Sequence, residues 1–322
     1  MSSAQVHAMN AYFMDGVRTL SQQKTAKLRS LVSVEPVRGE RQAIDALTGT
    51  NLARKTARNA KVPVVETPRL RRWFSQKDFW GSERYDGFDR AREHTDPTGR
   101  LAQAWAAGAS REWDKCAVEA ALGTAFVDKY GNTPISLPAS QVIPHGGSGL
   151  TLAKVKEAVQ LLRRVSPDRE DPISLWMTGQ QESDLLNSAT VTSADYYAGR
   201  PLMDATIPYF MGAYFHVIDD YLDLTAPAAG NQSDGSTGTF QPIIPLDTTS
   251  VPGSQIRRVV ATLKSGVVMG ELVPITTEIN PAKEYGINSL QVQVEMSVGG
   301  TREHEAKVVV IECLDPSAMT FA

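Results

Sequence analysis

Residues 97–130 constrain the fold most, because their pattern predicts one long amphipathic helix. Hydrophobic residues recur three or four positions apart, which places them on one face of a helix. These residues are Leu101, Trp105, Ala109, Trp113, Cys116 and Ala120. Asp96 offers a capping side chain, and Pro97 suits the first turn because an N–H there has no helical partner. We therefore expect the two tryptophans of this face to pack into a core.

The polar residues of the same helix lie mostly off its hydrophobic face. Lys115 and Glu119 are four positions apart, so their opposite charges can meet on the helix surface. Arg111 and Asp114 are three positions apart and can meet in the same way. We therefore expect these four side chains to lie mostly off the face that packs into the core.

Length, composition and charge limit the class of protein. A chain of 322 residues, 42% of them hydrophobic, can form one large domain or two to three smaller ones with a real core. The net charge of −3 excludes a strongly basic nucleic-acid-binding protein overall. Cys116 and Cys313 stand in hydrophobic patterns and predict buried thiols in a reducing compartment. No hydrophobic run approaches the roughly 18 residues of a membrane helix, and no signal peptide is expected.

The N-terminal third is predicted to be extended and poorly stable alone. Residues 1–34 suggest a helical arm whose hydrophobic face is thin, so it gains stability by packing on something else. Two strand-like pieces, 42–47 and 62–73, flank a polar turn and predict a hairpin. Pro63 and Pro68 do not suit a central strand, so we expect an edge hairpin or a free-standing flap.

This flap is basic. Residues 38–72 contain nine Lys or Arg against three Asp or Glu, a balance of +6 that leaves −9 for the rest of the chain. Opposite charges on two surfaces attract, so the flap invites contact between copies of the chain. The alternative is that its basic cluster binds phosphates of a nucleic acid. The cluster comprises Arg54, Lys55, Arg58 and Lys61.

The remaining chain reads as alternating helices and strands. Helices are predicted at 151–164 and 180–187, and strands at 173–177 and 208–218, with hydrophobic character returning at 256–269. Residues 131–150 and 225–254 are rich in turn-forming residues, and the second stretch predicts a long surface loop. Residues 290–298 alternate hydrophobic and polar side chains, as a half-buried strand does. Gly299 and Gly300 are expected to turn this strand into an antiparallel hairpin with residues 307–314.

The sequence offers no catalytic, cofactor or metal site. Residues 145–149, HGGSG, lack the second glycine of a nucleophile elbow because position 150 is leucine, so a flexible glycine loop is expected. A hydrolase that uses Ser148 is a remote alternative. Three acids close in sequence could bind a metal but are expected only to be solvated; they are Asp219, Asp220 and Asp223. The histidines show no ligand spacing; they are His7, His94, His145, His216 and His304.

Four segments, taken in order, resemble the major capsid proteins of tailed bacteriophages, which share the α+β Hong Kong 97-like fold. They are AAGASREWDKCAVEAALGTA (106–125), LTLAKVKEAVQLL (150–162), MGAYFHVIDDYLDL (211–224) and SVGGTREHEAKVVVIECLD (297–315). The resemblance covers nearly the whole chain and implies a division into named parts. These are an N-terminal arm (1–34), an extended E-loop (35–85), a P domain with a spine helix (86–150), an A domain (151–271) and C-terminal P-domain strands (272–322).

The resemblance also implies which residues meet. The E-loop would lie over the adjacent subunit, through Arg54, Lys55, Arg58, Lys61, Arg69, Arg71 and Arg72. The spine helix would pack on the C-terminal sheet through Leu101, Trp105, Trp113 and Cys116.

The function implied is structural and not enzymatic, without cofactors. Such proteins assemble as pentamers and hexamers into an icosahedral shell around double-stranded DNA, which they contact non-specifically. The implied partners are further copies, scaffold and portal proteins and a cement protein. The implied location is the virion, after assembly in the bacterial cytoplasm. Two alternatives stay open: an encapsulin-like cellular compartment and a nucleic-acid-binding protein that uses residues 54–72.

Overall fold

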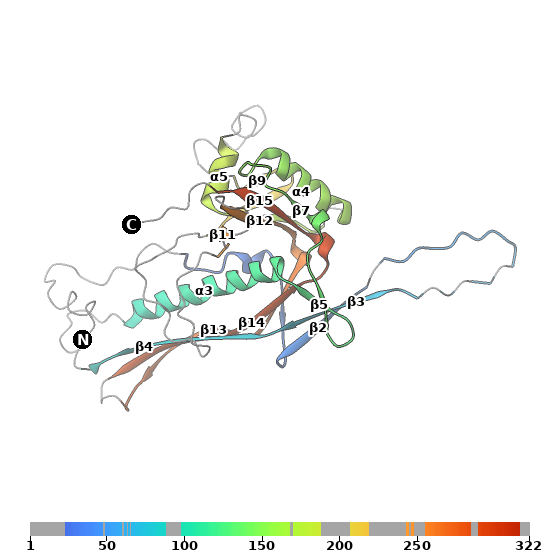
Figure 1. The fold of residues 1–322 in the computed structure, drawn as a ribbon. Coiled ribbons are helices and arrows are strands. Elements are labelled where there is room, and N and C mark those ends of the chain that lie inside the picture. Colours follow the sequence, from blue (N-terminus) through green and yellow to red (C-terminus); the bar gives the residue numbers. More distant parts are fainter. Residues whose placement is uncertain are drawn as a thin grey trace.

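The protein is described here by a computed structural model with an α+β architecture (Figure 1). The residues it describes are 23–47, 49–59, 61–62, 64, 66–87, 98–167, 170–187, 207–218, 243–244, 246–247, 255–284 and 289–315. Within these ranges the strands form three sheets, which we call the long sheet, the central sheet and the stem sheet.

The long sheet has the strand order β1-β13-β14-β4. Its strands are β1 (Ser33–Pro36), β13 (Val267–Pro281), β14 (Leu290–Arg302) and β4 (Lys77–Tyr85). β13 and β14 pair antiparallel, and β1 adds in parallel at the outer edge of β13. The alternation predicted for 290–298 is confirmed, since Val292, Val294, Met296 and Val298 are buried. The helix α3 (Thr98–Leu122) lies along one face of this sheet (Figure 1).

The helix is shorter than predicted. It ends at Leu122, and residues 125–127 form a strand, so the expectation of a helix to 130 is wrong. Gly123 donates its N–H to the carbonyl of Glu119 and closes the last turn. The helix does not continue beyond this turn, because the side chain of Arg302 donates hydrogen bonds to the carbonyls of Ala121 and Gly123. A side chain from β14 thus caps the C-terminal end of α3.

The central sheet has the strand order β7-β15-β12-β8-β10-β9, with β11 paired to β12. Its strands are β7 (Val142–Ile143), β15 (Val308–Leu314), β12 (Ile256–Leu263), β8 (Ile173–Met177), β10 (Ala213–Val217), β9 (Tyr209–Phe210) and β11 (Leu246–Asp247). Helices α4 (Leu152–Val165) and α5 (Gly179–Leu186) lie beside it (Figure 1). β8 is buried along its whole length. The helices predicted at 151–164 and 180–187 and the strand predicted at 173–177 are therefore confirmed.

Two strand predictions need correction. Residues 208–218 do not form one strand, because Met211 and Gly212 take positive φ angles and turn β9 back onto β10. β14 and β15 do not form a hairpin, because β14 continues to Arg302 and β15 belongs to the central sheet. Gly299 lies inside β14, where a side chain would collide with the backbone oxygen of Ser75. This glycine therefore permits a close approach and does not make a turn.

The N-terminal segment is not helical where it is described. Residues 23–27 are irregular, η1 (Leu28–Ser30) is one short 3₁₀ turn, and β1 follows. Residues 1–22 lie outside the described part of the chain, as does most of the predicted loop 225–254. The described part of the N-terminal arm therefore joins the fold through a 3₁₀ turn and an added strand.

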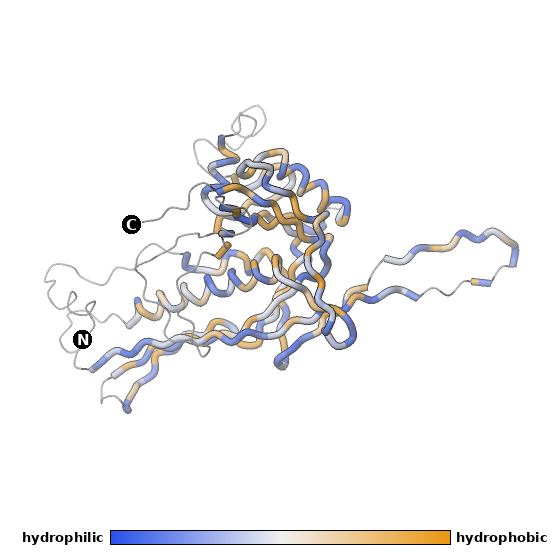
Figure 2. The backbone as a smooth tube through the Cα atoms, in the orientation of Figure 1, coloured by the Kyte–Doolittle hydropathy of each residue, from blue (hydrophilic) through white to orange (hydrophobic). Residues whose placement is uncertain are grey.

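The stem sheet carries the predicted flap. Its strand order is β2-β3-β5-β6, with β2 (Arg41–Leu47), β3 (Arg69–Ser75), β5 (Ala125–Val127) and β6 (Thr133–Ile135). β2 and β3 pair antiparallel, so the hairpin is confirmed, although its second strand begins at Arg69 and not near residue 62. Residues 48–68 join the two strands of this stem, and we call them the projecting loop; those that the structure describes (49–59, 61–62, 64 and 66–68) extend away from the body (Figure 1). Hydrophobic and hydrophilic stretches alternate along the loop (Figure 2).

Candidate inter-subunit surfaces

The projecting loop is the most exposed part of the described chain. Leu52 is 100% exposed and Val64 is 95% exposed, so neither side chain packs on its own subunit. The basic cluster expected to make inter-subunit contacts is also exposed; it comprises Arg54, Lys55, Arg58 and Lys61. A segment without side-chain burial cannot offset the entropy lost on ordering, so it needs a neighbour to become rigid.

An exposed ion pair joins the two strands of the stem that carries this loop. Arg71 lies opposite Asp45 across the strands and donates to both of its carboxylate oxygens, at 2.6 and 2.7 Å. The hydrogen bonds from Arg71 lower the pKa of Asp45. Such exposed pairs contribute little to stability, but a bidentate pair fixes strand register. Arg69 is exposed in the same strand, close to the loop.

Arg72 differs from the other basic residues of the flap. Its side chain is 3% exposed and donates to the carbonyl of Glu303 at 3.1 Å and to the carboxylate of Glu305 at 2.5 Å. The expectation that Arg72 reaches a neighbouring subunit is therefore wrong. Strand alternation explains the difference, because Arg69 and Arg71 point to one side of β3 and Arg72 to the other. Arg72 instead ties the stem to η4 (Glu305–Lys307).

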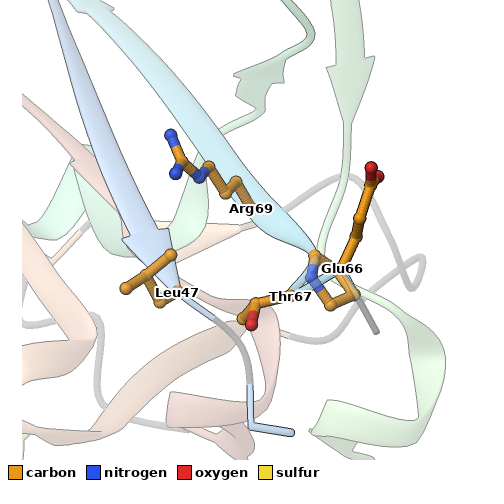
Figure 3. A pocket seen from close by; sticks show the side chains of 5 residues that line it. Leu47, Glu66, Thr67 and Arg69 are labelled. Carbon is orange, nitrogen blue, oxygen red and sulfur yellow. The ribbon is translucent and has the colours of Figure 1, made fainter. Parts of the chain in front are cut away.

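A surface hollow lies where the loop leaves the stem (Figure 3). Its volume is about 860 Å³, and it is lined by Leu47, Glu66, Thr67, Pro68 and Arg69. Its two charged side chains, Glu66 and Arg69, are exposed, as is Leu47. The hollow therefore lacks the buried polar groups that a substrate site needs.

Three of the four residues expected on the buried face of α3, namely Trp105, Trp113 and Cys116, pack with residues of the long sheet. Trp113 is buried, and its indole N–H donates to Glu271 of β13 at 2.9 Å. Trp105 is half-buried and lies over Gly81 of β4, where a side chain would collide with its ring. Leu101 is half-buried and Cys116 is buried. Burial raises the pKa of the Cys116 thiol to about 12, which makes it unreactive at neutral pH.

Asp114 is a buried residue that the sequence analysis placed off the hydrophobic face of the helix. It is 0% exposed and accepts hydrogen bonds from Gln23 Nε2 at 2.5 Å and from the backbone N–H groups of Lys27 at 2.9 Å and Leu28 at 3.0 Å. The N-terminal segment is thus anchored on α3 by one carboxylate. The local sequence gave no signal for this burial, because the donors come from residues 23–28, far away in the chain.

The glycine-rich segment 145–149 has a structural role. The ammonium of Lys154 donates to the carbonyls of His145, Ser148 and Gly149 at 2.8 to 2.9 Å and to that of Glu312 at 3.1 Å. The segment wraps this buried cation and fixes β15 beside α4. It is thus more ordered than the flexible loop expected from the sequence.

Ser148 does not have the surroundings of a nucleophile. Its hydroxyl donates to the carbonyl of His145 at 3.2 Å. The ring Nδ1 of His145 accepts the backbone N–H of Gly147 and is not directed at Ser148. Gly146 and Gly147 take positive φ angles of 55° and 73°, which glycine adopts readily. The glycines therefore serve the turn around Lys154, and the hydrolase alternative finds no support in this geometry.

Replacing Lys154 by methionine should lower the free energy of unfolding by about 2 kcal/mol, because buried carbonyls lose their donor. Lys156 lies on the same helix with an exposed side chain and provides the matched control. Its replacement by methionine should change stability by less than about 0.5 kcal/mol. Urea unfolding of both variants measures the difference, and equal effects would contradict a stabilising role for the carbonyl cage.

Comparison with known families identifies the chain. A sequence model described as "Phage capsid protein" matches residues 6–315. The chain belongs to the phage capsid protein family. As a member of that family it is a structural major capsid protein, and the resemblance inferred from its sequence is confirmed. A search of curated proteins finds no match.

Solved phage capsids share the fold of this capsid protein. The Cyanophage Pam1 capsid matches with a TM-score of 0.63 at 11% identity, covering 98% of each chain. The capsid of Ralstonia phage GP4 matches with a TM-score of 0.62 at 11% identity, covering 96% of each chain. The mature capsid of bacteriophage PhiM1 matches with a TM-score of 0.61 at 14% identity, covering 94% of this chain and 91% of the other. These matches confirm the expected capsid fold.

The last candidate features of the capsid protein to consider are metal sites and membrane helices. Across the described ranges, no three His, Cys, Asp or Glu side chains gather where they could hold a metal ion. His7, His94 and the acids Asp219, Asp220 and Asp223 lie outside those ranges. No helix in the described part of the chain combines the length and hydrophobicity that a membrane crossing requires. The family and fold comparisons give no support to the encapsulin-like or nucleic-acid-binding alternatives.

Proposed function

We propose that this capsid protein assembles into pentamers and hexamers that close into an icosahedral shell around double-stranded DNA. The observation that carries the proposal is the projecting loop, which holds exposed hydrophobic and basic side chains away from its own body. Such a loop becomes ordered only when another copy covers it, so the subunit is complete only within an assembly.

The architecture supports a division of the subunit into a P domain, an A domain and an E-loop. The long sheet with α3 corresponds to the P domain, and the central sheet with α4 and α5 corresponds to the A domain whose loops meet at the centre of each capsomer. Because β15 belongs to the central sheet, residues 308–314 join the A domain in this proposal. Residues 35–85 form the E-loop, which lies over the adjacent subunit.

The partners follow from the same role. Scaffold and portal proteins would direct assembly in the bacterial cytoplasm, and a cement protein would bind the finished virion. The packaged DNA would meet the inner face of the shell through non-specific contacts with phosphates. No enzymatic step and no cofactor enter this function.

Shortening the projecting loop should abolish assembly without unfolding the subunit. Replacing residues 50–64 by a Gly-Ser turn removes side chains that are exposed at every position the structure describes there, so the melting temperature should stay within about 2 °C. Particle yield, measured by gradient sedimentation and negative-stain microscopy, should fall at least about tenfold. A same-length Gly-Ser replacement tests whether the side chains or only the length matter.

Two results would contradict the proposal. If the unaltered protein remains a monomer under all assembly conditions while residues 38–72 are ordered, the shell function is wrong. If the shortened variant forms particles as well as the unaltered protein, the loop does not carry assembly.

A further inference from the structure

Two arginine side chains are buried near each other where the stem sheet packs on the body. Arg72 of β3 is 3% exposed, and Arg302 at the end of β14 is 0% exposed. Arg302 reaches the stem sheet, because its Nη2 donates to the carbonyl of Ile135 in β6 at 3.2 Å. Burial lowers the pKa of Arg302, while the charge of Glu305 raises it and the charge of Arg72 lowers it again. The two guanidinium groups are therefore close enough to repel each other.

The charges of this cluster do not cancel. Glu305 pairs with Arg72, whose Nη2 donates to Oε2 of the carboxylate at 2.5 Å. Within the described part of the chain Arg302 forms no ion pair, and its hydrogen bonds go to the carbonyls of Ala121, Gly123 and Ile135. Two positive charges thus meet one negative charge, which leaves +1. A buried charge without a counter-charge is costly, because the interior solvates it poorly.

The same cluster contains hydrogen-bond donors without an acceptor. Nη1 of Arg72 and Nε of Arg302 are buried, and neither has a partner among the described residues. Oε1 of Glu305 is buried without a partner there as well. Nearly all buried N–H groups of proteins are paired, and an unpaired donor on a charged group costs most. A water molecule between Arg72 and Glu305 satisfies hydrogen bonds but leaves the excess positive charge. An anion accepts from the free donors and also cancels that charge.

We infer that Arg72 and Arg302 form a binding site for a small monovalent anion, with chloride as the ligand. The ligand must be small, because side chains that are 3% and 0% exposed leave no open surface for a phosphate group or a carboxylate of another chain. One donor belongs to β3 and the other to β14, so the bound ion joins the stem sheet to the long sheet. This inference concerns the single subunit and does not depend on the proposed shell function.

Thermal unfolding of the unaltered protein tests the site. Sodium chloride replaces sodium gluconate at constant ionic strength and pH, and circular dichroism follows the melting temperature. A ligand that binds only the folded state stabilises it in proportion to the logarithm of its concentration above Kd. With a Kd of about 10 mM, raising chloride from about 1 mM to about 100 mM should raise the melting temperature by about 3 °C. The same melting temperature in both salts would overturn the site.

Inorganic phosphate tests the size of the ligand. Sodium phosphate at the same ionic strength should raise the melting temperature by less than a third as much as chloride, because the buried site excludes the larger ion. A shift with phosphate equal to or greater than the shift with chloride would overturn the assignment of a small monovalent anion.

Two variants of neighbouring arginines in β3 separate the site from general salt effects. Arg72→Met removes the Nη1 donor and one of the two positive charges, so the response to chloride should disappear. Arg71→Met removes an exposed guanidinium on the other side of the same strand and should keep the full response. Equal chloride responses in the two variants would overturn the site. Circular dichroism in gluconate shows whether each variant folds.

Bromide gives a direct test on the unaltered protein, which does not depend on the folding of any variant. Bromide has the charge of chloride and scatters X-rays anomalously. Crystals grown in sodium bromide should show an anomalous peak in contact with Nη1 of Arg72 and Nε of Arg302. An ordered water molecule at that place without anomalous signal, or bromide peaks only on the protein surface, would overturn the inference.

Discussion

Replacing Arg302 by methionine should lower the free energy of unfolding by about 3 kcal/mol. The Arg302 side chain is 0% exposed, and it donates to the carbonyls of Ala121 and Gly123 and, at 3.2 Å, to that of Ile135. These groups belong to the end of α3 and to β6, so one guanidinium joins helix, stem sheet and long sheet. Methionine fills the space but donates no hydrogen bond, which leaves buried carbonyls unpaired.

Two further variants sharpen this test. Arg302→Lys keeps the charge but lacks the planar fork, so it should recover only part of the loss. Arg164→Met removes an exposed arginine from α4 and should change stability by less than about 0.5 kcal/mol. Urea unfolding followed by circular dichroism gives the values. A loss for Arg302→Met no larger than that for Arg164→Met would show that the cap is not needed.

Replacing Asp114 by alanine should cost about 3 kcal/mol, because two backbone N–H groups and one side-chain amide lose their acceptor. The loss should be local, since these donors all belong to residues 23–28. Hydrogen exchange should therefore quicken most strongly in the N-terminal segment and β1. Uniform acceleration over both sheets would contradict an anchoring role.

The same residue should make stability depend on pH. Burial raises the pKa of Asp114 to about 6 from its ordinary value of 3.8, so the folded protein binds this proton more tightly than the unfolded chain. The stabilisation is complete below pH 3.8 and is lost as the pH rises through 6. Between pH 5 and pH 7.5 the loss should be about 1.4 kcal/mol. Asp114→Asn should lack this component, and identical pH profiles for both proteins would contradict it.

The sequence predicted those parts of the fold whose signal is local. The hydrophobic spacing from Leu101 to Trp113 identified α3, and alternation along residues 290–298 identified β14, because burial on one face imposes a period. The end of α3 was missed because its cap comes from Arg302, far away in the chain. Gly299 and Gly300 were misread as a turn, because a glycine that permits close packing looks in sequence like a glycine that bends the chain.

The candidate interface was predicted in part for the same reason. Composition identified the flap and its charge, and the exposed positions of Arg54 and Arg58 agree with that expectation. Composition could not separate Arg71 from Arg72, which point to opposite sides of one strand. The sequence also could not place Glu278 and Glu295 near Trp80, because only strand pairing brings these residues together.

The buried ion pair between Arg72 and Glu305 joins the stem of the flap directly to the body of the subunit. β3 is joined through Arg72 to η4, and it pairs with β5, which follows α3 after only Gly123 and Thr124. In the proposed shell, a force that a neighbouring copy exerts on the loop would therefore reach both the end of α3 and η4, which precedes β15 of the central sheet. The angle between adjacent subunits of that proposed shell would then depend on the orientation of this stem.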